Sequence, residues 1–370
     1  MSTMDPYGVD IVACRGRQRR LLAALEPLGV ELALLGRHES VQWLTGALVR
    51  PPFAPLAAIT SLGHVTLVLP ERQLDVLAAV DELVGYEAKW HSTTRDDQRA
   101  ASAAVLRSKL PAAPRRAAVE FSAFCPHHFL PWDAAFVDVE PVLFQLRRRK
   151  DADELRMLRR ANEANRAMYE EARRIIRPGV NELEVYSALH AVAVRTLGEP
   201  LTYLGQDFRS SARGGPPRNR AAEAGELFIL DLGVGFRGYF SDNARTFAVD
   251  REPTDEQRRA WQAVADVFPA IESTVRPGAS CRELFQTVQR ELDEYLPWTF
   301  NHHLGHGVGL ASQEGPHLNP GWEDSFAEGD FIAVEPGLYH QSLRHGVRLE
   351  QNYLVTNDGV ELLTDWPLGL

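Results

Sequence analysis

Five residues in the second half of the chain have side chains that could bind metal ions. They are four carboxylates and one imidazole: Asp231, Asp242, His306, Glu335 and Glu350. Asp231 and Glu335 each follow four apolar residues, a pattern that predicts the end of a buried strand. A charge buried there is costly unless another charge compensates it, and a metal ion does so. One such acid alone would more commonly cap a strand in solvent, but five in related places favour a metal site.

The spacing of these residues predicts that they converge. Asp242 lies eleven residues after Asp231, across Gly235 and Gly238, which suits a hairpin that returns the second strand beside the first. Glu350 lies fifteen residues after Glu335, across another glycine, and repeats this arrangement. His306 stands in a Gly-His-Gly-Val-Gly segment, where glycines let neighbouring backbone approach closely.

The ligand set indicates which ions would bind. Four carboxylates and one imidazole are a hard, oxygen-rich set that favours Mn²⁺, with Co²⁺ and Zn²⁺ as alternatives and copper disfavoured. Two divalent ions neutralise a ligand charge near −4, and carboxylates readily bridge such a pair. We therefore predict a two-metal hydrolase centre that activates a bridging water molecule.

A weak internal repeat supports the same convergence. Two Arg-Pro-Gly segments, at residues 177–179 and 276–278, lie 99 residues apart, and each is followed by a capping-box pattern that predicts a helix start. The patterns are Asn181 with Glu184, and Ser280 with Glu283. Downstream, a glycine precedes both Asp231 and Glu335 by six residues. The two copies thus end corresponding strands with an acid.

The elements that position these residues fall into two predicted domains, 1–150 and 151–370. The first alternates helix and short apolar strand: a helix over 21–28, strands over 32–35, 57–59 and 65–69, and a helix over 74–84. Asp151 and Glu154 form a capping box that opens a long amphipathic helix ending before Pro178. The basic run at residues 147–150 is interpreted as a solvated linker.

Composition limits the classes of partner and the compartment. The 370 residues carry a formal net charge of −10, which argues against nucleic acid and anionic membranes as partners. Cys14, Cys125 and Cys281 have no paired spacing, so neither disulfides nor a thiolate metal site is expected. Residues 1–20 have no apolar core of a signal peptide. We expect a cytoplasmic protein.

At these positions the chain resembles the pita-bread metallopeptidases of the M24 type. These include Xaa-Pro aminopeptidases, prolidases and methionine aminopeptidases, with creatinase as a metal-free relative. The likeness covers residues 151–370, and the first half resembles the creatinase-type N-terminal domain. It implies an α/β N-terminal domain and an α+β pita-bread catalytic domain with an internal pseudo-two-fold repeat. The motifs that carry it are Leu230-Asp231-Leu232-Gly233, Ser241-Asp242-Asn243-Ala244-Arg245-Thr246, Gly305-His306-Gly307-Val308-Gly309, Glu335-Pro336-Gly337-Leu338-Tyr339 and Gly346-Val347-Arg348-Leu349-Glu350.

The resemblance also implies a role for each ligand. Asp231 would chelate the first metal, and Asp242 and Glu350 would bridge the two ions. His306 and Glu335 would bind the second metal, and Glu335 would also be the proton shuttle.

Further residues match positions on the substrate side. His302 and Arg348 do so, and Tyr339 does so less closely; for each, a structural hydrogen bond is the alternative. The resemblance further implies a homodimer, a small peptide or amide substrate and, by its motifs, an Xaa-Pro dipeptidase or aminopeptidase activity.

Two departures from the family pattern leave other functions open. Gly214 and Gln313 stand where the proline peptidases usually have histidines. One alternative is therefore a creatinase-like or ectoine-hydrolase-like enzyme, or a lyase, acting on a small nitrogenous metabolite. Another is a catalytically inert binding module. Nearby, Arg213, Arg218 and Arg220 could recognise a carboxylate or belong to a polar loop.

Overall fold

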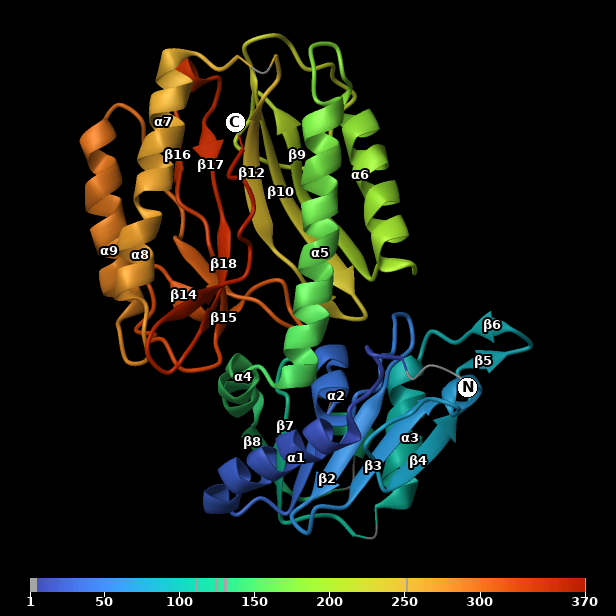
Figure 1. Cartoon of the computed structure of the whole chain (residues 1–370). Helices are drawn as coiled ribbons and strands as arrows, with labels where there is room; N and C mark the ends of the chain where they lie inside the picture. The colour runs from blue at the N-terminus through green and yellow to red at the C-terminus, as the bar shows by residue number, and fades with distance from the viewer. Residues whose placement is uncertain (1–4, 111, 124–125, 130–131, 251, 370) are drawn as a thin grey trace. The chain divides into compact units, whose positions relative to one another are not determined.

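The computed structural model describes residues 5–110, 112–123, 126–129, 132–250 and 252–369, so Cys125 lies outside the described residues. The chain divides into two compact units, Met1–Arg147 and Arg148–Leu370. Figure 1 labels their helices and strands. Cys14 and Cys281 are both buried, and they are not bonded to each other.

The first unit contains a six-stranded sheet with helices. Its strand order is β4-β3-β2-β1-β7-β8, and β1 pairs parallel with β7 but antiparallel with β2. These strands are β1 (Leu32–Leu35), β2 (Leu56–Thr60), β3 (Val65–Pro70), β4 (Glu82–Tyr86), β7 (Arg116–Val119) and β8 (Ala135–Asp138), with a separate hairpin of β5 (Lys89–Trp90) and β6 (Thr93–Thr94). The helices are α1 (Ile11–Leu25), α2 (His38–Thr45), α3 (Gln98–Lys109) and α4 (Glu140–Arg148), with short 3₁₀ turns at Glu26–Leu28, Glu71–Gln73 and Pro126–Phe129.

The helix predicted over residues 74–84 is wrong. Glu82–Tyr86 form strand β4, which pairs parallel with β3. The apolar residues of this segment suit either a helix or a strand, and pairing with a buried neighbouring strand decides between them. Asp81 helps to fix the strand entry, since its carboxylate accepts the Val65 N–H at 2.8 Å.

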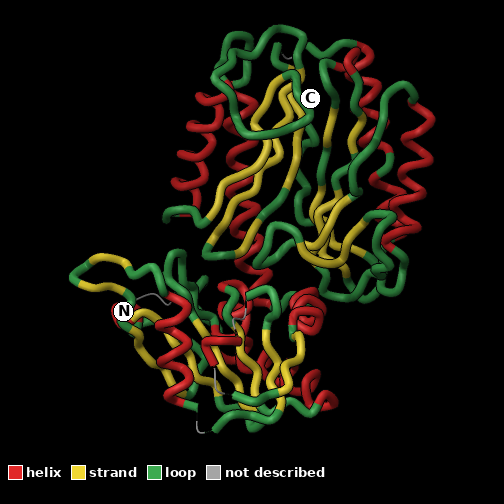
Figure 2. The backbone as a smooth tube through the Cα atoms, turned by 180° about the vertical axis from the view of Figure 1, so that it is seen from behind, coloured by secondary structure: helices red, strands yellow, loops and turns green. Residues whose placement is uncertain are grey.

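The second unit consists of two halves with the same order of elements, helices followed by antiparallel strands (Figures 1 and 2). The first half contains α5 (Ala152–Ile175), α6 (Glu182–Leu197), β9 (Tyr203–Ser210), β10 (Leu227–Phe236), β11 (Tyr239–Phe240) and β12 (Asn243–Ala248). The second contains α7 (Asp255–Asp266), α8 (Phe268–Thr274), α9 (Cys281–Leu292), β13 (Gly305–Gly307), β14 (Glu314–Leu318), β15 (Phe331–Val334), β18 (Gln351–Val355) and β19 (Val360–Leu362). A small hairpin of β16 (Gly337–Leu338) and β17 (Val347–Arg348) and two 3₁₀ turns, Asp293–Tyr295 and Gln341–Leu343, complete it.

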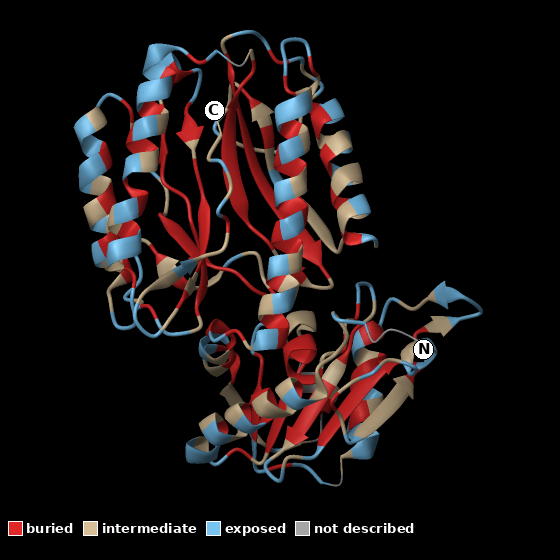
Figure 3. Cartoon of the chain, in the orientation of Figure 1, coloured by how far each residue is buried: buried red, intermediate tan, exposed pale blue. Residues whose placement is uncertain are grey.

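The helices of this unit pack one face on the strands. In Figure 3 the strands are largely buried, while the outward helix faces are exposed. The predicted capping box opens α5, because Glu154 accepts the Asp151 N–H at 3.0 Å. Asn181 and Ser280 are the N-caps of α6 and α9, as the repeat predicts. The full capping boxes predicted there are not formed, since Asn181 accepts from the Leu183 N–H and Ser280 accepts from the Glu283 N–H without a reciprocal bond from the glutamate. Among the described residues, none of the helices is long and apolar enough to cross a membrane.

The interpretation of residues 147–150 as a solvated linker is wrong. Arg148 Nη2 lies 2.6 Å from Asp330 Oδ2, and these side chains are 9% and 0% exposed. Lys150 Nζ lies 2.7 Å from Glu314 Oε1, again with both side chains largely buried. Charge pattern alone could not reveal these pairs, because their acidic partners lie more than 160 residues away in the sequence.

The Asp330→Ala substitution should lower the free energy of unfolding by about 3 kcal/mol, because it leaves the buried Arg148 guanidinium without its carboxylate. Glu170→Ala is the matched control, since it removes an exposed partner of Arg166 and should change stability by less than about 0.5 kcal/mol. Urea unfolding followed by tryptophan fluorescence measures both values. Equal effects of the two substitutions would contradict a buried, stabilising ion pair between Arg148 and Asp330.

Candidate metal centre

The five predicted ligand residues come together from strands of both halves of the second unit. The prediction that a strand ends at Asp231 is wrong, because β10 keeps pairing with β9 beyond Asp231 and continues to Phe236. Asp231 lies in β10, Asp242 directly precedes β12, His306 lies in β13, Glu335 directly follows β15 and Glu350 directly precedes β18. Carboxylate oxygens of Asp231, Asp242 and Glu350 lie within 4.8 Å of one another. The Nε2 atom of His306 lies 3.6 Å from oxygens of both Asp242 and Glu335. The sequence therefore identified residues that form one cluster.

The two hairpins are joined by reciprocal hydrogen bonds behind the carboxylates. The Asn243 side-chain amide donates to the Glu350 carbonyl oxygen at 2.9 Å. The Asn352 amide donates to the Asp242 carbonyl oxygen at 2.7 Å. Because each amide comes from the opposite half, these bonds fix Asp242 and Glu350 relative to each other.

Glycines bring the His306 strand close to its neighbours. A Cβ atom at Gly305 would lie 2.0 Å from the Ala333 carbonyl oxygen, and one at Gly307 would lie 2.0 Å from the Gly315 carbonyl oxygen. Both positions therefore require glycine. The Nδ1 atom of His306 lies 2.9 Å from the Gly307 carbonyl oxygen, so Nδ1 carries the proton and Nε2 is directed at the carboxylates.

The carboxylate cluster is buried, and Arg348 compensates only part of its charge. The oxygens without a hydrogen-bond partner are Asp231 Oδ1, Asp242 Oδ1 and both carboxylate oxygens of Glu350. Burial, together with the neighbouring carboxylates, raises the pKa of Asp242 and of Glu350 well above the usual range. Burial raises the pKa of Asp231 to about 6 despite the nearby Arg348. These unsatisfied, mutually repelling oxygens fit divalent metal ions, which supply the missing charge and bonds.

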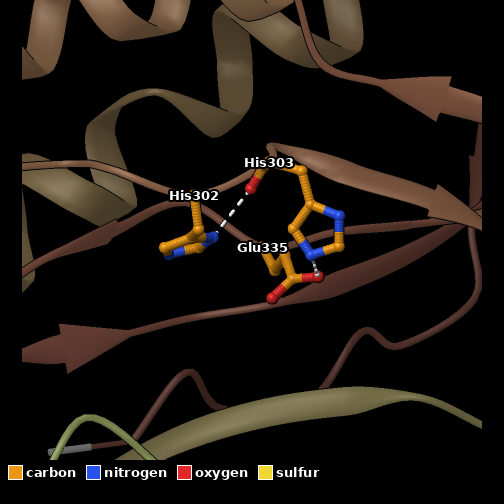
Figure 4. Close-up of side chains that lie close together, drawn as sticks. All are labelled: His302, His303 and Glu335. Atoms are coloured by element: carbon orange, nitrogen blue, oxygen red, sulfur yellow. Dashed lines mark hydrogen bonds and ion pairs between the residues drawn. The ribbon is translucent and has the colours of Figure 1, made fainter. Parts of the chain in front are cut away.

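Glu335 contacts an imidazole that the sequence did not single out (Figure 4). His303 Nε2 lies 3.0 Å from Glu335 Oε1. Burial acts to raise the pKa of Glu335, but the hydrogen bond and charge of His303 outweigh it and lower the value to about 2. His303 stands three residues before His306, and this spacing within the motif was the available signal.

His302, Tyr339 and Arg348 form a chain of hydrogen bonds beside the carboxylates. His302 Nε2 lies 2.9 Å from the Tyr339 hydroxyl, which accepts from Arg348 Nε at 3.0 Å. Arg348 Nη1 in turn donates to Asp231 Oδ2 at 2.6 Å. Burial lowers the pKa of His302 to about 4, so this ring is neutral near pH 7. Its Nδ1 donates to the His303 carbonyl oxygen, so both ring nitrogens of His302 are engaged.

The three arginines of the 210–220 segment differ in role. Arg218 pairs with Glu182 at 2.6 Å and Arg220 with Glu226 at 2.5 Å, and both of these carboxylates are buried. These two arginines therefore hold the loop itself. The Arg213 guanidinium lies 4.2 Å from the centroid of the Tyr339 ring, next to the site.

The two positions without the expected histidines have different surroundings. Gly214 lies directly against Asp207, a residue that the sequence analysis missed, whereas Gln313 is exposed. Asp207 accepts from Arg348 Nη1 at 2.9 Å. Nothing in its local sequence marks Asp207, because strand pairing alone brings it beside Asp231.

Comparison with known proteins identifies related families for both units of the chain. The model of metallopeptidase family M24 matches residues 156–357, and that of the creatinase/prolidase N-terminal domain matches residues 17–149. An Xaa-Pro dipeptidase from Pyrococcus horikoshii is 30% identical over 233 residues, which is 62% of this chain and 66% of the relative. The chain thus matches just under two thirds of that relative's length.

Solved structures share the fold over nearly the whole chain. The prolidase from Pyrococcus horikoshii OT3 superposes with a TM-score of 0.81 at 23% identity, covering 95% of this chain and 99% of that one. Aminopeptidase P from Escherichia coli superposes with a TM-score of 0.78 at 19% identity, covering 97% and 96%. The predicted pita-bread fold with a creatinase-like N-terminal domain is therefore confirmed. Together with the family match over its second unit, this shows that the chain belongs to metallopeptidase family M24.

Proposed function

We propose that this protein is a dinuclear-metal hydrolase that cleaves a peptide bond in small Xaa-Pro substrates, as a dipeptidase or aminopeptidase. One observation carries the proposal: buried carboxylates of Asp231, Asp242 and Glu350 converge with four oxygens that have no hydrogen-bond partner. Membership of a metallopeptidase family supports the chemistry, and the Xaa-Pro dipeptidase relatives support the substrate.

Each ligand has a distinct role in this proposal. Asp231 would hold the first ion, Asp242 and Glu350 would supply carboxylate oxygens to both ions, and His306 and Glu335 would hold the second. The oxygen-rich set favours Mn²⁺, with Co²⁺ or Zn²⁺ as alternatives. Such a pair of ions polarises the scissile carbonyl and activates a water molecule as the nucleophile.

The surrounding residues move the proton and orient the substrate. Glu335 takes a proton from the nucleophile and returns it to the leaving nitrogen. His303, 3.0 Å away, holds the Glu335 carboxylate in place. His302 and Arg348 lie on the substrate side, and their shared contact with Tyr339 keeps them in fixed orientations.

A second candidate function keeps the fold and the metals but changes the substrate. The absence of imidazoles at Gly214 and Gln313 favours a small nitrogenous metabolite, as for a creatinase-like or ectoine-hydrolase-like enzyme or a lyase. An inert binding module is a third candidate, which the complete set of acidic ligands disfavours. Turnover on peptides separates the first candidate from the other two.

The wider organisation is proposed on the same basis. Residues 1–150 act as the creatinase-like domain and residues 151–370 as the catalytic domain of a homodimer. We place the protein in the cytoplasm, because its cysteines have no paired spacing. Light scattering of the purified protein tests the dimer.

Purified protein supplied with Mn²⁺ should hydrolyse members of a panel of Xaa-Pro dipeptides and longer Xaa-Pro peptides. Asp242→Asn should reduce kcat/KM by at least about 100-fold, since even residues that only support metal ligands typically contribute 10- to 100-fold. Glu199→Gln is the control, because it removes a carboxylate that pairs with Arg237 instead. Complete inactivity across the panel would refute proline specificity, and full activity of Asp242→Asn would refute the bridging role.

In the metal-free protein, the contribution of the buried carboxylates to stability should fall as pH rises from 5 to 7, while the lowered pKa values of His302 and His306 act in the opposite direction. Because the folded state raises the pKa of Asp231 to about 6 and of Asp242 further, it favours their protonated forms. That stabilisation is complete below the unfolded pKa near 4 and disappears as pH passes the raised values. Glu335 shifts to about 2 instead, so its contribution is already complete above pH 5.

Saturating Mn²⁺ should reverse this trend, because the metal binds the deprotonated carboxylates. Urea unfolding at each pH, with and without Mn²⁺, measures the difference, which should reach a few kcal/mol. Identical pH profiles in the two conditions would contradict metal binding by these carboxylates.

A further inference from the structure

Asp207 is an acid beside the cluster that has no role in the proposed function. It lies in β9 directly opposite Asp231 of β10 in an antiparallel pair. Opposite residues in such a pair point to the same face of the sheet, so both carboxylates lie on the face that carries the candidate metal ligands. Its side chain is 14% exposed.

Both carboxylate oxygens of Asp207 have partners. Its Oδ2 accepts from Arg348 Nη1 at 2.9 Å, and the same nitrogen donates to Asp231 Oδ2 at 2.6 Å. Its Oδ1 accepts the Gly215 N–H at 2.5 Å. Arg348 is thus shared between a candidate metal ligand and a carboxylate outside the ligand set.

The remaining nitrogens of Arg348 are also fixed. Its Nε donates to the Tyr339 hydroxyl at 3.0 Å, and its Nη2 donates to the Arg213 carbonyl oxygen at 2.8 Å. The guanidinium plane is therefore held on three sides. Only Nη1 contacts Asp231, so the way Nη1 divides its hydrogen bonds between Asp207 and Asp231 sets how much of the Asp231 charge is neutralised.

Gly214 is coupled to this arrangement by steric contact. A Cβ atom at position 214 would lie 2.1 Å from Asp207 Oδ2. A side chain there overlaps the Asp207 carboxylate, which must shift from its present position beside Arg348 unless the backbone moves. The glycine at position 214 and the carboxylate at position 207 therefore belong together.

We propose that Asp207 is a positioning residue that shares the charge of Arg348 and so keeps Asp231 available to bind a metal ion, and that Gly214 leaves the space it needs. Without Asp207, the guanidinium pairs with Asp231 alone and competes with the metal for that carboxylate. This inference rests on the proposed metal-binding role of Asp231.

Mn²⁺ binding measured by isothermal titration calorimetry tests the inference without relying on activity. Asp207→Asn, which is nearly isosteric, should weaken Mn²⁺ binding about tenfold, the lower end of the range for residues that support metal ligands. Gly214→Ala should weaken it similarly, because it displaces the same carboxylate. The double variant should be no weaker than either single one.

Repeating the Asp207→Asn substitution in a protein that lacks Arg348 distinguishes an effect exerted through Arg348 from a direct effect of the Asp207 charge on the metal. In Arg348→Gln protein, Asp207→Asn should change Mn²⁺ affinity less than about twofold, because the residue through which Asp207 acts is gone. A through-space effect of the Asp207 charge would persist at full size there. Persistence would overturn the positioning role.

Two control variants, together with Mn²⁺ binding measured on the unaltered protein, make the outcome decisive. Glu199→Gln removes an arginine-paired carboxylate elsewhere, and Gly359→Ala adds a Cβ atom where no atom lies within 4 Å. Neither should change Mn²⁺ affinity. Unchanged affinity in Asp207→Asn would overturn the inference while leaving the proposed function intact, whereas no Mn²⁺ binding by the unaltered protein would overturn both.

Discussion

The mutual repulsion of carboxylates buried at one place is the constraint on which the second unit depends. Asp231, Asp242 and Glu350 converge within 4.8 Å although each is almost fully buried. Like charges in a low-dielectric interior would separate or take up protons unless the fold held them and cations joined them. The reciprocal bonds of Asn243 and Asn352 hold the cluster from behind, one from each half of the internal repeat.

Positively charged side chains pair with some of the carboxylates and not with others. The carboxylates without such a partner are the ones proposed to be shared by two metal ions. Asp231 pairs with Arg348, and Glu335 with His303. Within the part of the chain that the structure describes, neither Asp242 nor Glu350 pairs with a lysine or arginine. Because these two carboxylates are the proposed bridges, the largest deficit of positive charge lies where two metal ions would share ligands.

Patterns local in the sequence predicted more than contacts made through space. The apolar runs before Asp231 and Glu335 predicted both strands, although β10 continues beyond Asp231 to Phe236, and the hairpin spacings predicted that the acids converge. Pairing between residues far apart in the sequence was not predictable. For this reason a helix was expected where β4 lies, and residues 147–150 were expected to be a solvated linker although Arg148 forms a buried ion pair. Asp207 was missed for the same reason, since only its register against β10 reveals it.

Locating the metal ions is the most direct test of this account. Crystals of the protein grown with Mn²⁺, with diffraction recorded at the manganese absorption edge, give an anomalous difference map that shows the metal alone. We predict two peaks roughly 3.5 to 4 Å apart, both in contact with Asp242 and Glu350. A single peak, or peaks only elsewhere on the protein, would contradict the two-metal centre.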